Sequence, residues 1–375
     1  MAKEAKSTRG VSLSASEGSR PRSAVVKFSS SIAARRPLRA TFIFGISTVL
    51  AIAATGCGGS KKAAKTACST QECLVASVSR GVVEVRDSRD GMGTGFIIDK
   101  QKRLVLTAAH VVAGSSALKV RYKDQTTSAQ LLGENPCQDV ALLKVSDLPP
   151  NTRALTFGDS STIKSGQRIT GLGFPISLQN PRQNEKLVAN PGSLTADGTV
   201  EATPEPDLPT YPAVIQHQAP TTYGDSGGPI VNRLGKVIGM EALGNPDATS
   251  QGYAIASNHL TSLLPDLKAG KFTAYVGMLV EPPSFRSNQE IKDMGWSYQP
   301  FGKTGVAVYG VDTGSPADNH NFVFGDYIRF INGSTVNSEQ DFCDILQSNE
   351  GKIIKITGYD LVNTGKVYEA KMRVR

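Results

Sequence analysis

The stretch TTYGDSGGPIV, residues 221–231, decides the fold, because it places three glycines and a proline around a single serine, Ser226. Glycine loses more backbone entropy on folding than any other residue, and proline has no N–H to donate. The cluster therefore indicates a backbone that takes an unusual path. It predicts either an ordinary tight turn between two strands or a turn that directs one hydroxyl and nearby N–H groups at a reacting atom.

The segments on both sides of this stretch have the pattern of a β-rich chain. From residue 74 to about residue 268, short apolar runs alternate with turn residues, and the 37 Gly and 20 Pro punctuate strands more than helices. This rhythm predicts a sandwich or one or two barrels. Residues 176–211 break the rhythm and are predicted to be loop-rich, because their prolines disfavour central strands. Residues 257–272 predict a closing helix that ends at Gly270.

A serine hydroxyl is a weak nucleophile unless a histidine accepts its proton, and the chain has four histidines. His110 ends the apolar run RLVLTAAH. Asp139 directly precedes the apolar run VALLKV, where an unpaired charge would be unfavourable. We therefore predict that Ser226 is the nucleophile, His110 the general base and Asp139 the carboxylate that orients the imidazole. The alternative is a core histidine and a turn serine with structural roles only.

The other three histidines are predicted to lie outside this constellation. His217 is near Ser226 in sequence and is a rival base, but its place on a separate strand favours a structural or substrate-edge role. His259, in the predicted closing helix, and His320 are interpreted as ordinary surface or helix residues.

The net charge of +8 is concentrated at the N-terminus. Residues 1–40 hold nine Lys or Arg and two Glu, and residues 41–56 hold no charge, so the rest is close to neutral. A nucleic-acid-binding groove is therefore not indicated. The basic region, the short apolar run and the small residues after it predict an export signal over residues 1–56. The apolar run is too short to span a bilayer comfortably as a permanent helix.

Cys57 follows Ala-Thr-Gly directly and resembles the lipobox cysteine of bacterial lipoproteins. The resemblance implies lipidation at Cys57 and an anchor on the outer face of a bacterial membrane, in the cell envelope. The alternative is a plain secretory signal cut nearby. Residues 57–75 are polar and small, which is typical of a tether.

Four further cysteines, Cys68, Cys73, Cys137 and Cys343, allow three full disulfide pairings in an exported chain. Cys343 lies in the helix-like segment SEQDFCDILQS, which favours a small buried hydrophobe. None of the four has the spacing of a metal site, and no cofactor is expected.

Residues beyond about 272 mix strand patterns with two helix signals and predict a small α+β module. Ser315 before Pro316 is suited to an N-cap followed by the first helical position. Ser338 is suited to a second N-cap, with Asp341 at the capping-box position.

Three motifs in the order His, Asp, Ser resemble the trypsin-like serine proteases, and further elements resemble their bacterial HtrA or DegP-like branch. The resemblance implies an all-β fold of two perpendicular barrels over residues 76–268, with the triad between them. It also implies that the backbone N–H groups of Gly224 and Ser226 bind the oxyanion. The motifs are TAAHVV, DVALLKV and YGDSGGPIVN, and the elements of the branch are GTGFII, GFP and GYAIAS.

Two positions depart from the patterns of these proteases, Asp225 from the HtrA branch and Pro220 from trypsin. Asp225 stands at the position where the HtrA branch usually has Asn. We nevertheless expect that the chain needs no zymogen cleavage to become active. Pro220 stands where the base of a trypsin pocket is an Asp, so a basic side chain would find no partner. With Pro220 and Tyr223 as pocket candidates, the sequence predicts cleavage after a small or medium aliphatic residue.

The C-terminal module, residues 272–375, resembles a PDZ domain of the circularly permuted bacterial kind. YVGM at 275–278 matches its carboxylate-binding loop, and the segment from SPADN to SEQDF resembles its core. The resemblance implies that C-terminal peptides add as a strand. The alternative is a degenerate module that only packs on the protease. The loop candidates are Tyr275, Val276, Gly277 and Met278.

The sequence thus predicts an exported serine endopeptidase that hydrolyses unfolded or damaged exported proteins through an acyl-enzyme. The resemblance makes a homotrimer an expectation as well. Two alternatives are a proteolytically weak or inactive chaperone or peptide-binding protein, and a dedicated processing protease with one substrate.

Overall fold

The computed structural model describes residue 68 and residues 70–88, 91–176, 186–203, 209–244, 251–282, 304–360 and 366–375. The predicted export signal, Cys57 and most of the predicted tether lie outside the described residues. Ala64–Arg375 forms one compact unit. Within its described part, no helix is long and apolar enough to cross a membrane, and no three His, Cys, Asp or Glu side chains are grouped to hold a metal ion.

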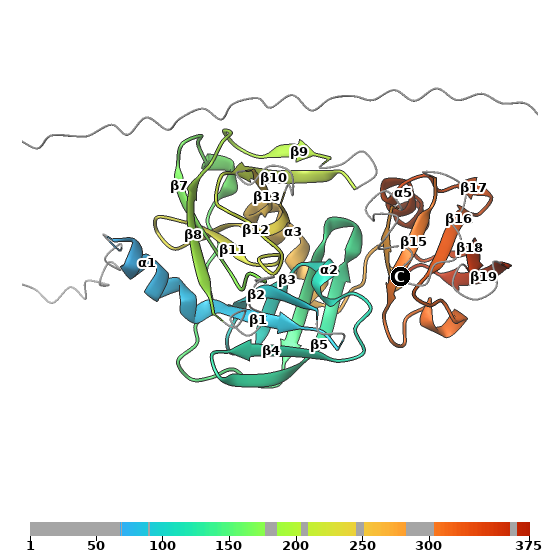
Figure 1. Cartoon of the computed structure of the whole chain (residues 1–375), viewed down its shortest axis with the longest axis horizontal. Helices are drawn as coiled ribbons and strands as arrows, with labels where there is room; N and C mark the ends of the chain where they lie inside the picture. Colours follow the sequence, from blue (N-terminus) through green and yellow to red (C-terminus); the bar gives the residue numbers. More distant parts are fainter. Residues whose placement is uncertain are drawn as a thin grey trace, which may run out of the picture. The chain divides into compact units, whose positions relative to one another are not determined.

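The first sheet is a closed antiparallel barrel in the order β1-β2-β3-β6-β5-β4 (Figure 1). Its inward side chains, such as Phe96, Leu106 and Leu142, are fully buried. The sequence pattern did not predict β5, because the first half of that strand is polar and exposed. The strands are β1 (Val82–Arg86), β2 (Met92–Asp99), β3 (Leu104–Thr107), β4 (Leu118–Tyr122), β5 (Gln125–Asn135) and β6 (Val140–Val145).

The second sheet has seven antiparallel strands in the order β8-β7-β11-β12-β13-β10-β9. Its hydrogen-bond order is open, and a bridge from Leu194 to His217 brings the end of β8 to the end of β10. Two of its strands, β8 and β9, lie in the segment predicted to be loop-rich. Pro191 is tolerated in β8 because that strand is at the sheet edge. The strands are β7 (Arg168–Gly173), β8 (Val188–Ser193), β9 (Val200–Ala202), β10 (Tyr211–His217), β11 (Pro229–Asn232), β12 (Val237–Gly244) and β13 (Gly252–Ala256).

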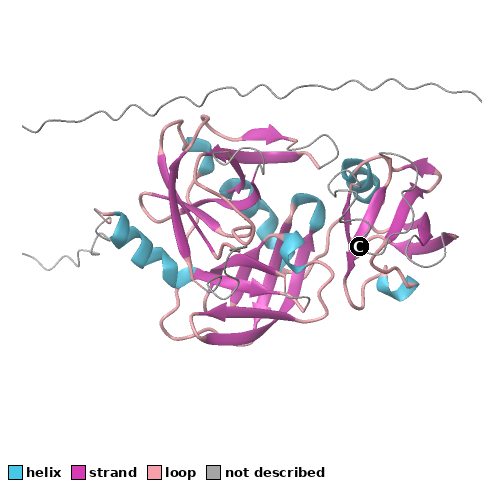
Figure 2. Ribbon diagram, viewed as in Figure 1, coloured by secondary structure: helices cyan, strands magenta, loops and turns pink. Residues whose placement is uncertain are grey.

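Helices are few, as Figure 2 shows for the described chain. The predicted closing helix is α3 (Ser257–Lys268), which buries Leu260, Leu264 and Leu267. Gly270 follows it with φ +79, a backbone conformation that glycine adopts without strain. An additional helix, α1 (Gln71–Val78), begins inside the predicted tether. Its first turn is stabilised by the Thr70 side chain, which accepts a hydrogen bond from the N–H of Cys73.

The third sheet has the order β14-β15-β16-β18-β19, with β17 paired to β16. We call this sheet together with α5 (Glu339–Ser348) the C-terminal module. Ser338 caps α5 as predicted, accepting from the N–H of Asp341 at 3.1 Å. After Ser315 only a short 3₁₀ helix forms, Asp318–His320, but Ser315 Oγ accepts from the N–H of Asp318 at 3.1 Å, as predicted for an N-cap. The strands are β14 (Met278–Glu281), β15 (Val306–Val311), β16 (Asp326–Ile331), β17 (Ser334–Thr335), β18 (Ile353–Asp360) and β19 (Val367–Arg373).

All four described cysteines are paired. Cys68 bonds Cys73, and Cys137 bonds Cys343. The prediction that Cys343 is only a small buried hydrophobe is therefore wrong: it is buried, but it also forms a covalent link to the first barrel.

Candidate active site

His110 and Asp139 lie in contact at one end of the first barrel. His110 is on the short helix α2 (Ala109–Val112), which follows β3, and Asp139 lies between the 3₁₀ turn Pro136–Gln138 and β6. The imidazole Nδ1 is 2.9 Å from Oδ2 and 3.0 Å from Oδ1 of Asp139. The backbone N–H of His110 also donates to Oδ1 at 2.9 Å. These contacts fix the imidazole and leave Nε2 for a proton transfer.

The environment of His110 favours its charged form. Burial opposes the charge on the imidazole, but the negative charge of Asp139, the hydrogen bond to it and the charge of Glu281 outweigh that effect. The pKa of His110 is consequently raised above its usual value. An imidazole whose positive charge is supported in this way is a better proton acceptor for a hydroxyl.

Ser226 lies in the turn between β10 and β11, and its side chain is half-buried. Gly224 and Gly227 have φ of +94 and +81, which explains two of the costly glycines in this stretch. A Cβ on Gly227 would collide with the carbonyl oxygen of Thr94. Within the described residues, no hydrogen bond engages the N–H groups of Gly224 and Ser226.

Thr94, a residue that the sequence reasoning did not single out, joins the serine turn to the first barrel. Its Oγ1 donates to the carbonyl of Gly224 at 2.6 Å, and its N–H donates to the carbonyl of Ser226 at 2.8 Å. Its own carbonyl accepts from the hydroxyl of Thr107, three residues before His110. One buried threonine thus links the nucleophile turn to the strand that leads to the base. No hydrogen bond joins Ser226 to His110 in the described part of the chain.

The sequence is similar to those of known proteins. A family profile described as a trypsin-like peptidase domain covers residues 93–240. The Serine protease Do-like HtrA of Bacillus subtilis is 28% identical over 296 residues, which is 77% of this chain and 64% of that protein. Do-like HtrB of the same organism is 30% identical over 265 residues, 68% of this chain and 55% of that protein. The chain is therefore similar to the HtrA/DegP-like proteases of the trypsin fold.

The chain spans only 55% to 64% of the length of the first HtrA-family relatives. Among solved structures, a protease of M. tuberculosis in its active form is 28% identical. The match covers 52% of this chain and 83% of that one, with a TM-score of 0.45.

Asp225, the departure from the usual HtrA-family Asn, is buried beside a small cavity. Its Oδ2 accepts from the N–H of Thr222 at 3.0 Å, while its Oδ1 has no hydrogen-bond partner among the described residues. Burial raises the pKa of Asp225 from its usual 3.8 to about 7, and the charge of Glu241 adds to the rise. Both carboxyl groups line this small cavity.

We expect Asp225 to make the protein less stable as the pH rises from about 4 to 7. The pKa of the folded state lies above that of the unfolded chain, so the folded protein binds more protons in this range and loses stability as they leave. Over about three pKa units the effect is at most about 4 kcal/mol. Both Asp225→Asn and its parent carry Ser226→Ala, which prevents self-digestion. The melting temperature of Asp225→Asn should rise relative to that of the parent progressively from pH 4 to 7.5. The exposed Asp147→Asn is the control, and equal melting temperatures across the range would contradict the account.

The two pocket candidates lie at the same turn. Pro220 lines the cavity next to Asp225 and is exposed. Tyr223, directly before Gly224, has a 77% exposed side chain and does not line the cavity. Neither residue supplies a negative charge that could pair with a Lys or Arg side chain.

Each of the other three histidines makes a polar contact with a residue other than Ser226. His217 is fully buried, with its Nε2 3.1 Å from Oε2 of Glu241, which supports the predicted structural role. His259 contacts Gln138 at 2.8 Å, and Nδ1 of His320 lies 2.7 Å from the carbonyl of Pro316.

The four candidates for a carboxylate-binding loop are all buried in the C-terminal module. The hydroxyl of Tyr275 donates to Asp312 at 2.9 Å, and its backbone exchanges hydrogen bonds with Arg375. The carbonyl of Val276 accepts from Ala317, and that of Gly277 accepts from Asp312. The role of Tyr275, Val276, Gly277 and Met278 in peptide binding stays a prediction.

Proposed function

We propose that this chain is a serine endopeptidase that uses Ser226 as nucleophile, His110 as general base and then acid, and Asp139 as the orienting carboxylate. The observation that carries the proposal is the pair of short contacts between Asp139 and Nδ1 of His110, which holds Nε2 ready for a proton. In the reaction Ser226 attacks the peptide carbonyl and His110 takes its proton. The N–H groups of Gly224 and Ser226 stabilise the oxyanion, and His110 then protonates the leaving amine. Water hydrolyses the acyl-enzyme by the same steps.

The proposed substrates are unfolded or damaged proteins outside the cytoplasm. The N-terminal export pattern supports this compartment, and so do two disulfides, which persist in oxidising surroundings. A lipid anchor at Cys57, C-terminal peptides at the C-terminal module and a homotrimer belong to the same proposal. They follow from the resemblance of the sequence to its family.

A digest of reduced, unfolded casein and of a peptide library tests this function. We expect many cuts, mainly after small or medium aliphatic residues, because the uncharged Pro220 cannot pair a basic side chain. A serine-reactive fluorophosphonate should stop the cleavage and leave its adduct on Ser226 in the peptide map. Cuts dominated by Lys and Arg would refute the pocket prediction. A single cut would favour a dedicated processing protease, and no adduct with no cleavage would refute the enzyme.

A further inference from the structure

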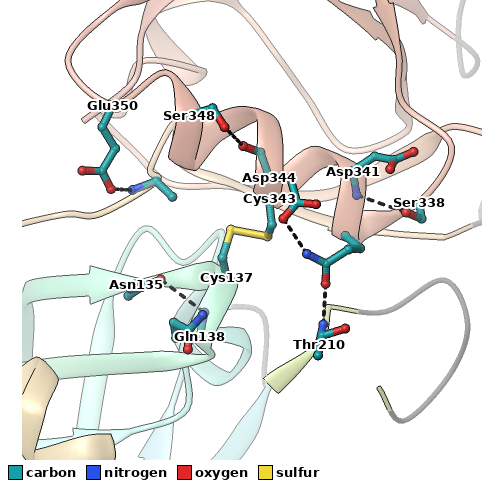
Figure 3. The surroundings of a disulfide bond; sticks show 12 residues. Asn135, Cys137, Gln138, Thr210, Ser338, Asp341, Cys343, Asp344, Ser348 and Glu350 are labelled. Atoms are coloured by element: carbon teal, nitrogen blue, oxygen red, sulfur yellow. Dashed lines mark hydrogen bonds between the residues drawn. A yellow bond between two sulfur atoms is a disulfide. The ribbon is translucent and has the colours of Figure 1, made fainter. Parts of the chain in front are cut away.

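The C-terminal module is linked covalently to the first barrel, 206 residues away in sequence, by the bond between Cys137 and Cys343 (Figure 3). Cys343 is on α5, and Cys137 is in the 3₁₀ turn Pro136–Gln138. Both are buried, and their Cα atoms are 5.6 Å apart. The link therefore joins a helix of the module to a turn of the barrel.

That turn sets the position of Asp139. The N–H of Asp139 donates to the carbonyl of Pro136 at 3.0 Å, and its φ of +51 is a left-handed conformation that the turn must hold. The side chain of Asn135 accepts from the N–H of Gln138 at 3.2 Å, as Figure 3 shows. Because Cys137 is two residues from Asp139, a displacement of the disulfide is transmitted to the carboxylate over very little chain.

The module also holds the His110 side of the pair. Asp312, just after β15, accepts a hydrogen bond from the N–H of Gly114, at the end of the segment that carries His110. Tyr275 donates to the other oxygen of Asp312. Glu281, at the end of β14, adds negative charge that raises the pKa of His110. The module thus contacts the segments that carry His110 and Asp139.

We propose that the C-terminal module positions His110 and Asp139 for catalysis through the Cys137–Cys343 bond and the Asp312–Gly114 hydrogen bond. Cys137, Cys343 and Asp312 are positioning residues, and the inference rests on the proposed protease function. Full activity then requires the oxidised protein. A dithiol reductant that cleaves the bond supplies two electrons and is itself oxidised to a disulfide, while Cys137 and Cys343 each gain a proton and become thiols.

The test compares wild type with Cys137→Ala/Cys343→Ala. We expect kcat on a short peptide to fall by about 10- to 100-fold, because a small displacement of a catalytic group is costly, while KM changes less than about twofold. The pKa of His110, followed by NMR, should fall toward the usual value of about 6.5 as its negative neighbours move away. A bond that only stabilises the fold would change the melting temperature and neither of these readouts.

The control is Cys68→Ala/Cys73→Ala, which removes the other disulfide and should leave kcat and the pKa of His110 unchanged. A folded Cys137→Ala/Cys343→Ala protein with wild-type kcat and an unchanged His110 titration would overturn the proposal. Should that variant not fold, Asp312→Ala, which keeps the disulfide, decides by the same two readouts. The NMR titration also separates the two claims: if wild type cleaves nothing, the protease function fails, while the response of His110 still decides the positioning role.

Discussion

Ser226→Ala is expected to lower kcat by about a million-fold. The small remaining activity would come from substrate binding and oxyanion stabilisation alone. Ser226 is the only proposed covalent partner of the substrate, and alanine has no hydroxyl to form an acyl-enzyme. The change removes one oxygen from a half-buried side chain. The fold should therefore persist, and kcat is the quantity to measure, with a chromogenic peptide at pH 8.

The matched control is Ser262→Ala, which removes an exposed hydroxyl on α3 and should leave kcat within about twofold. Circular dichroism of both variants checks that the fold is kept. Casein cleavage by Ser226→Ala at more than about a hundredth of the wild-type rate would mean that another group is the nucleophile, and the proposed mechanism would fail.

The proposed catalytic residues could be picked out from the sequence because each one is conspicuous locally. Asp139 is a charge placed next to an apolar strand, and Ser226 lies among glycines that two positive φ angles now explain. His110 follows a buried strand by three residues, in a chain that has only four histidines. These signals need no knowledge of distant contacts, so the structure brings His110 and Asp139 together as expected.

Other features could not be predicted, because they depend on partners far along the chain. Thr94 looks like an ordinary strand residue, and its role comes from hydrogen bonds to residues 130 positions away. The pairing of Cys137 with Cys343 is one of several that four cysteines allow. The strands β5, β8 and β9 were missed for a different reason. Their exposed or proline-containing faces lack the apolar alternation that marks a strand.

Asp139→Asn should lower kcat by about ten-thousand-fold, even though the side chain keeps its shape. Oδ1 of Asp139 accepts from the backbone N–H of His110 at 2.9 Å, and the carbonyl oxygen of an asparagine would keep this bond. Its amide N–H₂ would then face Nδ1 of His110, where Oδ2 now lies at 2.9 Å. Nδ1 can then accept a hydrogen bond from this amide, which favours the tautomer with the ring proton on Nε2. An imidazole with its proton on Nε2 cannot take the proton of Ser226.

The same exchange removes the negative charge that raises the pKa of His110, so the NMR titration of His110 should move to lower pH. Asp147→Asn, at an exposed position eight residues further on, serves as the control and should change neither quantity. A loss of kcat below about tenfold in a folded Asp139→Asn protein would show that the tautomer of His110 is set by something other than Asp139. Because the side chain keeps its shape, a lost rate in a folded protein is due to the altered proton position and charge of the pair, so this variant tests the chemistry more directly than removal of either side chain.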